Sequence, residues 1–348
     1  MRRITRIVIL LLSIALLLCA RRPLTPPTQR IGKPQRPATL VLTGDILLAG
    51  PVETAITREG VSAPFTGVSK VLSSADLAIG NLECPLATTG EPQSKEYTFR
   101  ARPDSAAALT SAGFDVVTLA NNHTVDYGPS ALMETLAALK KYHIRSVGAG
   151  EDSDAARRFI VTEAGSPPLR IAILGFSNME PTSFYARADR PGTNSAYPAR
   201  VKTDIAAARS RADLVVALFH WGDELSQTPS DSQRYLARIA VDAGADLVVG
   251  HHPHVLQGLA KRGSALIAYS LGNFVFPSRG EARHTMMLRY TVRQDGSRTA
   301  EIVPCVIEGF RPKIAAGAAR RKIVAEVRGM SQELGLSIPA DGVLPLPR

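Results

Sequence analysis

The chain has 348 residues, of which 45% are apolar and 21% are charged. It is long enough to bury a substantial core as one large domain or two small ones, and this composition excludes a mostly disordered chain. The formal net charge is +10. The lysines and arginines form no dense block interleaved with aromatic residues, so no nucleic-acid groove is expected. An anionic polymer or a phosphate ligand would suit the sign of the charge.

The chain opens with a basic stretch and an apolar run. Three arginines lie among the first six residues and precede residues 7–20, which are almost wholly apolar. Residues 1–20 therefore predict an export signal or membrane anchor, although the run is short for a membrane span. Cys19 could carry a lipid, but Leu18 precedes it where a small residue is usual. An uncleaved anchor, a lipid tether and a cleaved signal all remain open, and each places the body outside the cytoplasm.

The rest of the chain divides by composition into three parts. Residues 21–38 are rich in proline and arginine without an apolar period, which predicts an extended linker. Residues 39–315 carry the apolar periodicity of a folded domain. Residues 316–348 predict a helix at 319–334 and then a loose, proline-rich tail.

Buried apolar runs alternate with helical patterns through most of the expected domain. This alternation is typical of an α/β fold that contains much parallel sheet. Strands are expected at residues 39–48, 77–82, 116–120, 169–176, 214–219 and 246–249. Helices are expected at residues 104–112, 129–142, 198–210 and 230–243.

After residue 264 the pattern changes to apolar runs joined by turns. Strands are expected at residues 265–276, 285–293 and 299–307. The Asp295-Gly296 pair between the last two is typical of a hairpin, so this part is expected to be antiparallel. A second sheet packed on the first, with helices outside, would hold both halves in one domain.

Polar residues that can bind a metal lie at the ends of five of the expected strands. Ligand sites of α/β proteins gather at this edge of a sheet. Each cluster alone has a plainer explanation, such as a turn, a surface position or a hydrogen-bonded core histidine. Five clusters at five strand ends favour a common site. They are Asp45, Asn81–Glu83, Asn121–His123, His220 and His251–His254.

The residue types in these clusters suggest the class of metal. Carboxylates, an amide oxygen and imidazoles without a thiolate suit Mn²⁺, Fe²⁺ or Zn²⁺ better than Ca²⁺ or Mg²⁺. One or two ions are compatible with the set. Two ions would need a bridging carboxylate, for which Glu83 is the candidate.

Six motifs resemble, in the same order, the signatures of CapA-type poly-γ-glutamate capsule-synthesis proteins. They are TGDILLAG (43–50), GNLECPL (80–86), ANNHTVDYG (120–128), FHWGDE (219–224), GHHPHVLQG (250–258) and YSLGNFVF (269–276). The resemblance runs from about residue 39 to residue 310. This family is in turn similar to the calcineurin-like metallophosphoesterases, which implies a four-layer α/β/β/α sandwich.

The resemblance implies roles for individual residues. The implied metal ligands are Asp45, Glu83, Asn122, His220, His252 and His254. His123 is implied as the general acid that protonates a leaving oxygen, or as a contact to a substrate anion. The candidates for contacting substrate or supporting the ligands are Asn121, Asp126, His251 and Asn273.

Two positions depart from the metallophosphoesterase pattern. Leu47 stands where those enzymes carry a histidine ligand, and Glu83 stands where they carry the bridging aspartate. The first change weakens one metal position, and the second lengthens the bridge by a methylene group. A one-metal site, or a hydrolytic reaction other than phosphodiester cleavage, is therefore as compatible as a two-metal phosphodiesterase.

The resemblance implies a cell-envelope protein that acts in synthesis, export or anchoring of an anionic polymer, with a metal-dependent hydrolase-like site. Its substrate would be that polymer or a phosphate-containing molecule, and residues 1–20 would attach it to the membrane. The alternative is a non-catalytic, metal-binding accessory subunit of a membrane polymer synthase. Cys84 and Cys305 either form a disulfide or remain as two buried thiols.

Overall fold

The structure, a computed structural model, describes residues 36–346. Its larger sheet has a parallel half and an antiparallel half that share the strand β1. The parallel half consists of β1 (Ala38–Ile46), β2 (Leu77–Leu82), β3 (Val116–Thr118) and β4 (Arg145–Val147). The antiparallel half continues from β1 through β14 (His284–Val292), β15 (Arg298–Glu308) and β16 (Arg311–Ile314). Two short strands complete it: β13 (Asn273–Val275), parallel to β1, and β17 (Val343–Leu346), antiparallel to β15.

The second sheet is parallel at its centre and antiparallel at its edges. Its order is β11 (Leu259–Arg262), β12 (Ala265–Ala268), β10 (Leu247–His251), β9 (Leu214–His220), β7 (Leu169–Ser177) and β6 (Ile160–Ala164). Only the β11–β12 and β6–β7 pairs are antiparallel. A separate two-stranded ladder joins β5 (Ala149–Gly150) to β8 (Gly192–Thr193).

Apolar residues alternate along the strands and so face two different cores. Leu40 and Leu42 of β1 join Val216 and Leu218 of β9 in one cluster, which fills the space between the sheets. Val41 belongs instead to a cluster on the outer face of the larger sheet. A third cluster covers the outer face of the second sheet. This period of two is what a strand buried on both faces requires.

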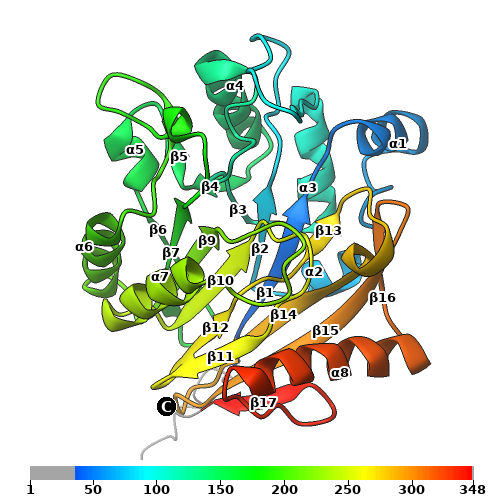
Figure 1. The fold of residues 1–348 in the computed structure, drawn as a ribbon, viewed down its shortest axis with the longest axis vertical. Coiled ribbons are helices and arrows are strands. Elements are labelled where there is room, and N and C mark those ends of the chain that lie inside the picture. Colours follow the sequence, from blue (N-terminus) through cyan, green and yellow to red (C-terminus); the bar gives the residue numbers. More distant parts are fainter. Residues whose placement is uncertain (1–35, 347–348) are drawn as a thin grey trace, which may run out of the picture. The chain divides into compact units, whose positions relative to one another are not determined.

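Helices cover both outer faces (Figure 1). Those on the larger sheet are α1 (Pro51–Glu59), α2 (Ser69–Leu72), α3 (Ala106–Ala112) and α4 (Gly128–Lys141). Those on the second sheet are α6 (Pro198–Arg209) and α7 (Asp231–Asp242), while α5 (Ser153–Arg157) contacts β5. α8 (Gly317–Glu333) buries its apolar side in the cluster between the sheets, next to β15 and β11. The predicted four-layer α/β/β/α sandwich is confirmed.

Three expectations about the C-terminal half and the linker need correction. The run 265–276 is two strands in different sheets, because Gly272, at φ 73, turns the chain between them. The tail is not loose throughout, since β17 pairs with β15. Residues 36–38 belong to the fold, because Arg36 forms a β-bridge with Ser166 and β1 begins at Ala38.

Other expectations concern the N-terminal segment and the cysteines. The predicted signal or anchor and most of the linker lie outside the described residues. No helix within residues 36–346 is long and apolar enough to cross a membrane. Cys84 and Cys305 are buried free thiols.

Candidate metal centre

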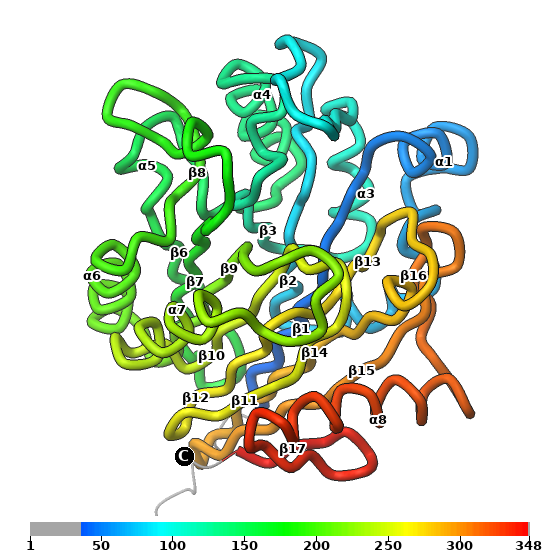
Figure 2. Tube along the Cα trace, viewed as in Figure 1, coloured from blue at the N-terminus to red at the C-terminus, as the bar shows by residue number. Residues whose placement is uncertain are grey.

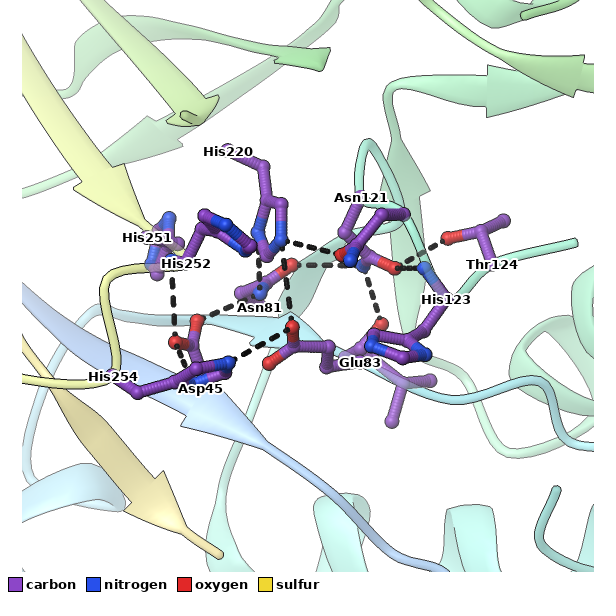
Figure 3. A network of polar contacts seen from close by, with 12 residues as sticks. Asp45, Asn81, Glu83, Asn121, His123, Thr124, His220, His251, His252 and His254 are labelled. Carbon is purple, nitrogen blue, oxygen red and sulfur yellow. Dashed lines mark hydrogen bonds and ion pairs between the residues drawn. The ribbon is translucent and has the colours of Figure 1, made fainter. Parts of the chain in front are cut away.

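The strand ends that carry the candidate residues meet at one edge of the two sheets (Figure 3). The larger sheet contributes Asp45 from the end of β1, Glu83 from just after β2 and residues 121–123 from the loop after β3. The second sheet contributes His220 from the end of β9 and residues 251–254 from the end of β10 onward. The structure thus brings together every cluster that the sequence singled out.

A close backbone approach places Asn273 beside Asp45. The Asp45 amide donates to the Gly272 carbonyl at 3.1 Å, and Asp45 pairs with Asn273 in the β1–β13 ladder. A Cβ atom on Gly44 would stand 1.9 Å from the Gly272 oxygen, so only glycine fits there. Gly44 therefore allows the segment that carries Gly272 and Asn273 to pack closely against β1 at the centre.

Glu83, His252 and His254 form a compact group of donors. One donor atom from each lies within 4.8 Å of the others. Both Glu83 oxygens and His252 Nδ1 are buried without a hydrogen-bond partner. Buried polar atoms nearly always have hydrogen-bond partners, and burying a carboxylate that accepts no hydrogen bond is destabilising. A divalent cation would satisfy these atoms together, so the residues present fit a metal, and a mixed N/O set suits Zn²⁺, Mn²⁺ or Fe²⁺.

The backbone of the His-His-Pro-His segment is unusual. His252 has φ 97 and His254 has φ 59, in the left-handed region that residues other than glycine rarely adopt. Such strain is typically retained where it serves function. Here it brings both imidazoles to the same side, with ring centres 5.6 Å apart.

Burial and charge shift the pKa values of this group in different directions. Burial, together with the charge of Asp45, raises the pKa of Glu83 well above its usual range. Burial lowers the pKa of His252 to about 3. Burial also opposes charging of His254, but Glu83 and Asp45 outweigh it and raise the pKa of His254 to about 10. The centre therefore favours a cation near its carboxylates.

A chain of hydrogen bonds sets which nitrogen of His254 faces the other donors. The Ser278 hydroxyl donates to the Phe276 carbonyl at 2.9 Å, so its oxygen accepts from the Asn273 amide nitrogen at 3.0 Å. The Asn273 oxygen then accepts from His254 Nδ1 at 2.9 Å. His254 Nε2 is left facing Glu83, 4.0 Å from Oε1. Histidine ligands usually donate their other ring hydrogen in this way, so Asn273 is placed to support His254.

Asp45 lies beside the donor group with both oxygens engaged. Its Oδ1 accepts from Asn81 Nδ2 at 2.8 Å. Its Oδ2 accepts from the His252 amide at 3.3 Å and lies 3.4 Å from His254 Nδ1. Burial raises the pKa of Asp45, but the hydrogen bond and charge of His254 lower it overall. In this arrangement Asp45 is ionised and orients the two histidines.

His220 and Asn122 contact each other beside Glu83. His220 Nε2 is 2.9 Å from Asn122 Oδ1 and 3.4 Å from Glu83 Oε1. His220 Nδ1 is 3.3 Å from Asn81 Nδ2, which also donates to Asp45. Because an amide nitrogen only donates, Nδ1 accepts and Nε2 carries the hydrogen here. Burial lowers the pKa of His220 well below its usual value, so the ring is neutral.

His123 is held at the side of the centre by Asp126. Its Nδ1 lies 2.7 Å from Asp126 Oδ2, which also accepts from the Phe99 amide at 2.8 Å. The His123 ring packs on Phe99, with centroids 4.6 Å apart. Burial lowers the pKa of His123, although Asp126 opposes the shift. The ring is therefore neutral near pH 7 and presents Nε2 away from Asp126.

Lys95 is a residue of the site that the sequence did not indicate. Its ammonium group donates to Asp126 Oδ1 at 2.9 Å and to the Asn122 carbonyl at 2.7 Å, and lies 3.2 Å from His123 Nδ1. It comes from a polar loop without apolar periodicity and away from any strand end that the sequence marks, so no local signal could have found it.

The two remaining candidates are structural. His251 turns away from the donors, with Nε2 3.0 Å from the Thr43 carbonyl and Nδ1 3.3 Å from the Phe219 carbonyl. Asn121 donates to the Leu82 carbonyl at 2.8 Å and accepts from the His123 amide at 3.0 Å. It holds the loop after β3 against the end of β2.

Comparison with known proteins places the chain in a family. A family model described as "Bacterial capsule synthesis protein PGA_cap" matches residues 39–278. The chain belongs to this family. The capsule biosynthesis protein CapA of Bacillus anthracis is 34% identical over 289 residues, covering 80% of this chain and 70% of that protein. The PGA biosynthesis protein CapA of Bacillus subtilis is 34% identical over 273 residues, covering 77% and 71%.

A third relative carries a different description. It is a probable polyglutamine synthesis accessory protein of Mycobacterium tuberculosis, 32% identical over 222 residues, which cover 61% of this chain and 58% of that protein. Together these matches confirm the resemblance drawn from the six motifs.

Within this capsule-synthesis fold, Leu47 contributes nothing to the centre. It is buried in the apolar cluster on the outer face of the larger sheet, and its amide bonds to the Val275 carbonyl at 2.8 Å. As expected from the sequence, position 47 therefore supplies no imidazole beside Asp45.

Proposed function

We propose that this protein works in the cell envelope on an anionic capsule polymer, in its synthesis, export or anchoring, and holds a divalent metal at the described centre. The observation that carries the metal proposal is the Glu83 carboxylate, which is fully buried with neither oxygen hydrogen-bonded, beside the unpartnered Nδ1 of His252. The family description and the names of the relatives support the polymer.

The residues divide into those that would hold the ion and those that would serve the reaction. Glu83, His252 and His254 would bind it. Asp45, Asn122 and His220 complete the proposed ligand set around them. For His220 to bind through Nε2, its hydrogen would have to move to Nδ1, with the Asn81 amide turned to present its oxygen there. When bound, the ion would supply Lewis-acid activation of water or of a substrate oxygen.

His123 is the proposed proton carrier of a hydrolytic reaction. Asp126 holds its Nδ1 hydrogen, so Nε2 is the atom that meets the substrate. Because the ring is neutral near pH 7, it takes up a proton at Nε2 before giving one to a leaving oxygen. Lys95 balances the charge of Asp126 and ties it to the Asn122 backbone.

The envelope location is proposed from two observations. The relatives are named for capsule and PGA biosynthesis, and a capsule lies outside the cell. The basic and apolar character of residues 1–20 is that of an export signal or anchor. Protease treatment of intact cells, with detection of residues 36–346, tests this placement.

Metal content of the purified protein tests the centre. His252→Gly removes an imidazole at φ 97, a conformation that glycine adopts without strain. His143→Gly is a matched control, because His143 is exposed, lies at the end of α4 and has φ 60. We expect bound metal in the wild type and the control and loss of metal in His252→Gly. Equal metal in all three proteins would overturn the assignment.

The second candidate is a non-catalytic accessory subunit of a membrane polymer synthase. It is favoured by the apolar Leu47 and by the limited access to the donors, since the His254 side chain is only 15% exposed. Polymer or phosphoester cleavage by the metal-loaded wild type, abolished in His123→Gln, would select the enzyme. Absence of turnover, with co-purification of a membrane synthase, would select the accessory role.

A further inference from the structure

A groove on the second sheet lies away from the metal centre. Its lining comes from α7, β11, β12 and the residues that follow β12 and α8. Figure 2 shows the backbone of these elements in one region of the molecule. Its volume is about 470 Å³. On this face α6 contacts β7 and β9, and α7 contacts β10. The groove lies where the β11–β12 hairpin continues the sheet beyond β10.

The floor of the groove is apolar and its walls are basic. Ala260, Ile267 and Tyr269 form the floor and are largely buried. The cationic side chains of the walls are Arg234, Arg238, Lys261 and Arg262, and the one acidic residue of the lining is Asp231. The composition of the lining is therefore that of a surface for a negatively charged ligand with apolar stretches.

One of these four cations is paired with a carboxylate of the protein. Arg262 is paired with Asp242 at 2.7 Å. Arg238 lies over the ring of Tyr235, 5.4 Å from its centre, and Tyr235 is 46% exposed. Within residues 36–346, neither Arg234, Arg238 nor Lys261 forms a salt bridge. Arg234 Nε donates to the Pro229 carbonyl at 3.2 Å, which engages one nitrogen of that guanidinium and leaves its charge unpaired. The charges of these three residues can therefore meet an outside anion.

We propose that this groove binds a stretch of a linear polycarboxylate, the anionic polymer of the proposed function on which this inference rests. Several carboxylates on one flexible chain would meet the separate cations of the walls, and many weak ion pairs along one chain add through effective concentration. The methylene groups between the carboxylates would lie on the floor formed by Ile267 and Tyr269. A compact ligand with a single charge would use only a fraction of this surface.

The groove is joined to the metal centre through covalent and hydrogen-bonded connections. Residues 221–230 lead from His220 in the centre to Asp231 in the groove. The indole nitrogen of Trp221 donates to the Tyr269 carbonyl at 3.0 Å. The groove and the strand end that carries His220 are therefore directly connected in the fold.

Binding of fluorescently labelled poly-γ-glutamate tests the groove. The full-length chain in mild detergent is titrated at low and at physiological salt, with neutral dextran as the comparison polymer. We expect Arg234→Glu/Arg238→Glu to weaken binding by about tenfold or more, because two cations become anions at the contact. Lys140→Glu/Lys141→Glu makes the same change of charge on exposed residues of α4 and should bind nearly as the wild type does.

The outcomes separate this inference from the proposed function. If the wild type binds tightly and both double variants bind equally well, the groove is not the binding site and the polymer binds elsewhere on the protein. Equal affinity for neutral dextran would overturn a charge-based site. If the wild type does not bind at low salt, both the groove proposal and the polymer part of the proposed function are wrong. The proposed metal centre is tested separately, by metal content. Binding that falls with salt and with the α7 variant alone would support the groove.

Discussion

Among single residues, Glu83 combines full burial, a raised pKa and two unpartnered oxygens. Its replacement by Gln removes the charge while keeping the shape. We expect Glu83→Gln to unfold at the same or a higher denaturant concentration than the wild type in the presence of a chelator, because burying a carboxylate that accepts no hydrogen bond is destabilising. With metal added at about one hundred times its dissociation constant, the wild type should gain about 2.7 kcal/mol and the variant almost nothing.

Urea unfolding with and without added Zn²⁺ or Mn²⁺ measures both effects. The control is Glu134→Gln, a change of the same kind on a carboxylate of α4 that bonds Thr88 and Thr89 far from the donors. Equal stabilisation of Glu83→Gln and the wild type by metal would contradict the role of Glu83.

Asn273 gives a second prediction for single residues. Its oxygen accepts the Nδ1 hydrogen of His254, so Asn273→Ala should weaken metal binding by about 10- to 100-fold, as loss of a supporting partner usually does. Asn273→Asp keeps an acceptor at the same place and should recover most of the affinity. Competition with a coloured chelator measures the affinities. An aspartate variant no better than the alanine variant would show that Asn273 does not act through this hydrogen bond.

At the level of elements, periodicity and apolar runs predicted the long helices and the central strands to within a few residues. The helix expected at 198–210 is α6, Pro198–Arg209, and the strand expected at 77–82 is β2. Edge strands such as β6 and β16 were missed, because their burial alternates or is partial and no long apolar run marks them. An apolar run also does not reveal where a chain changes sheet, as it does at Gly272.

The candidate site was also predicted only in part from the sequence. Residues at strand ends, such as Asp45 and His220, were predicted to meet because parallel strands end at one edge. Hydrogen bonds between distant segments, such as the one from His254 to Asn273, decide which of these side chains orient a neighbour and which are left without a partner. Lys95 was missed for that reason, since its importance lies only in what the fold brings near it.

The start of α7 offers a prediction for an element. Ser230 and Gln233 form a capping box, in which the Ser230 hydroxyl accepts from the Gln233 amide and the Gln233 side chain accepts from the Ser230 amide. Ser230→Ala should lower the free energy of unfolding by about 1 kcal/mol. Ser210→Ala, at the exposed end of α6, should change it much less. Equal losses in thermal and urea unfolding would show that the cap does not stabilise α7.

For the whole molecule, the two buried thiols predict a dependence of stability on pH. Burial raises the pKa of Cys84 and of Cys305 to about 12, from an ordinary value of 9.0. Below that ordinary value both states keep the proton, so the thiols have no effect. As pH rises from 9.0 toward 12, the unfolded chain alone ionises, and the free energy of unfolding falls.

The double variant Cys84→Ala/Cys305→Ala should therefore lose stability less steeply between about pH 8 and pH 10.5 than the protein with both thiols. Urea unfolding of each protein at both pH values gives the two slopes, with Cys19 replaced by serine in each to remove its contribution. The same slope in both proteins would contradict the burial of these thiols.

The donors of the centre are divided between the two sheets, with Glu83 on one and His252 and His254 on the other. A shared ion would act as a cross-link between the halves of the sandwich, and neither half alone could retain it. Metal capture would then be a late event that follows docking of the sheets. A chain exported unfolded would cross the membrane empty, and the ion it finally carries would be decided by the metals of the outer compartment rather than those of the cytoplasm.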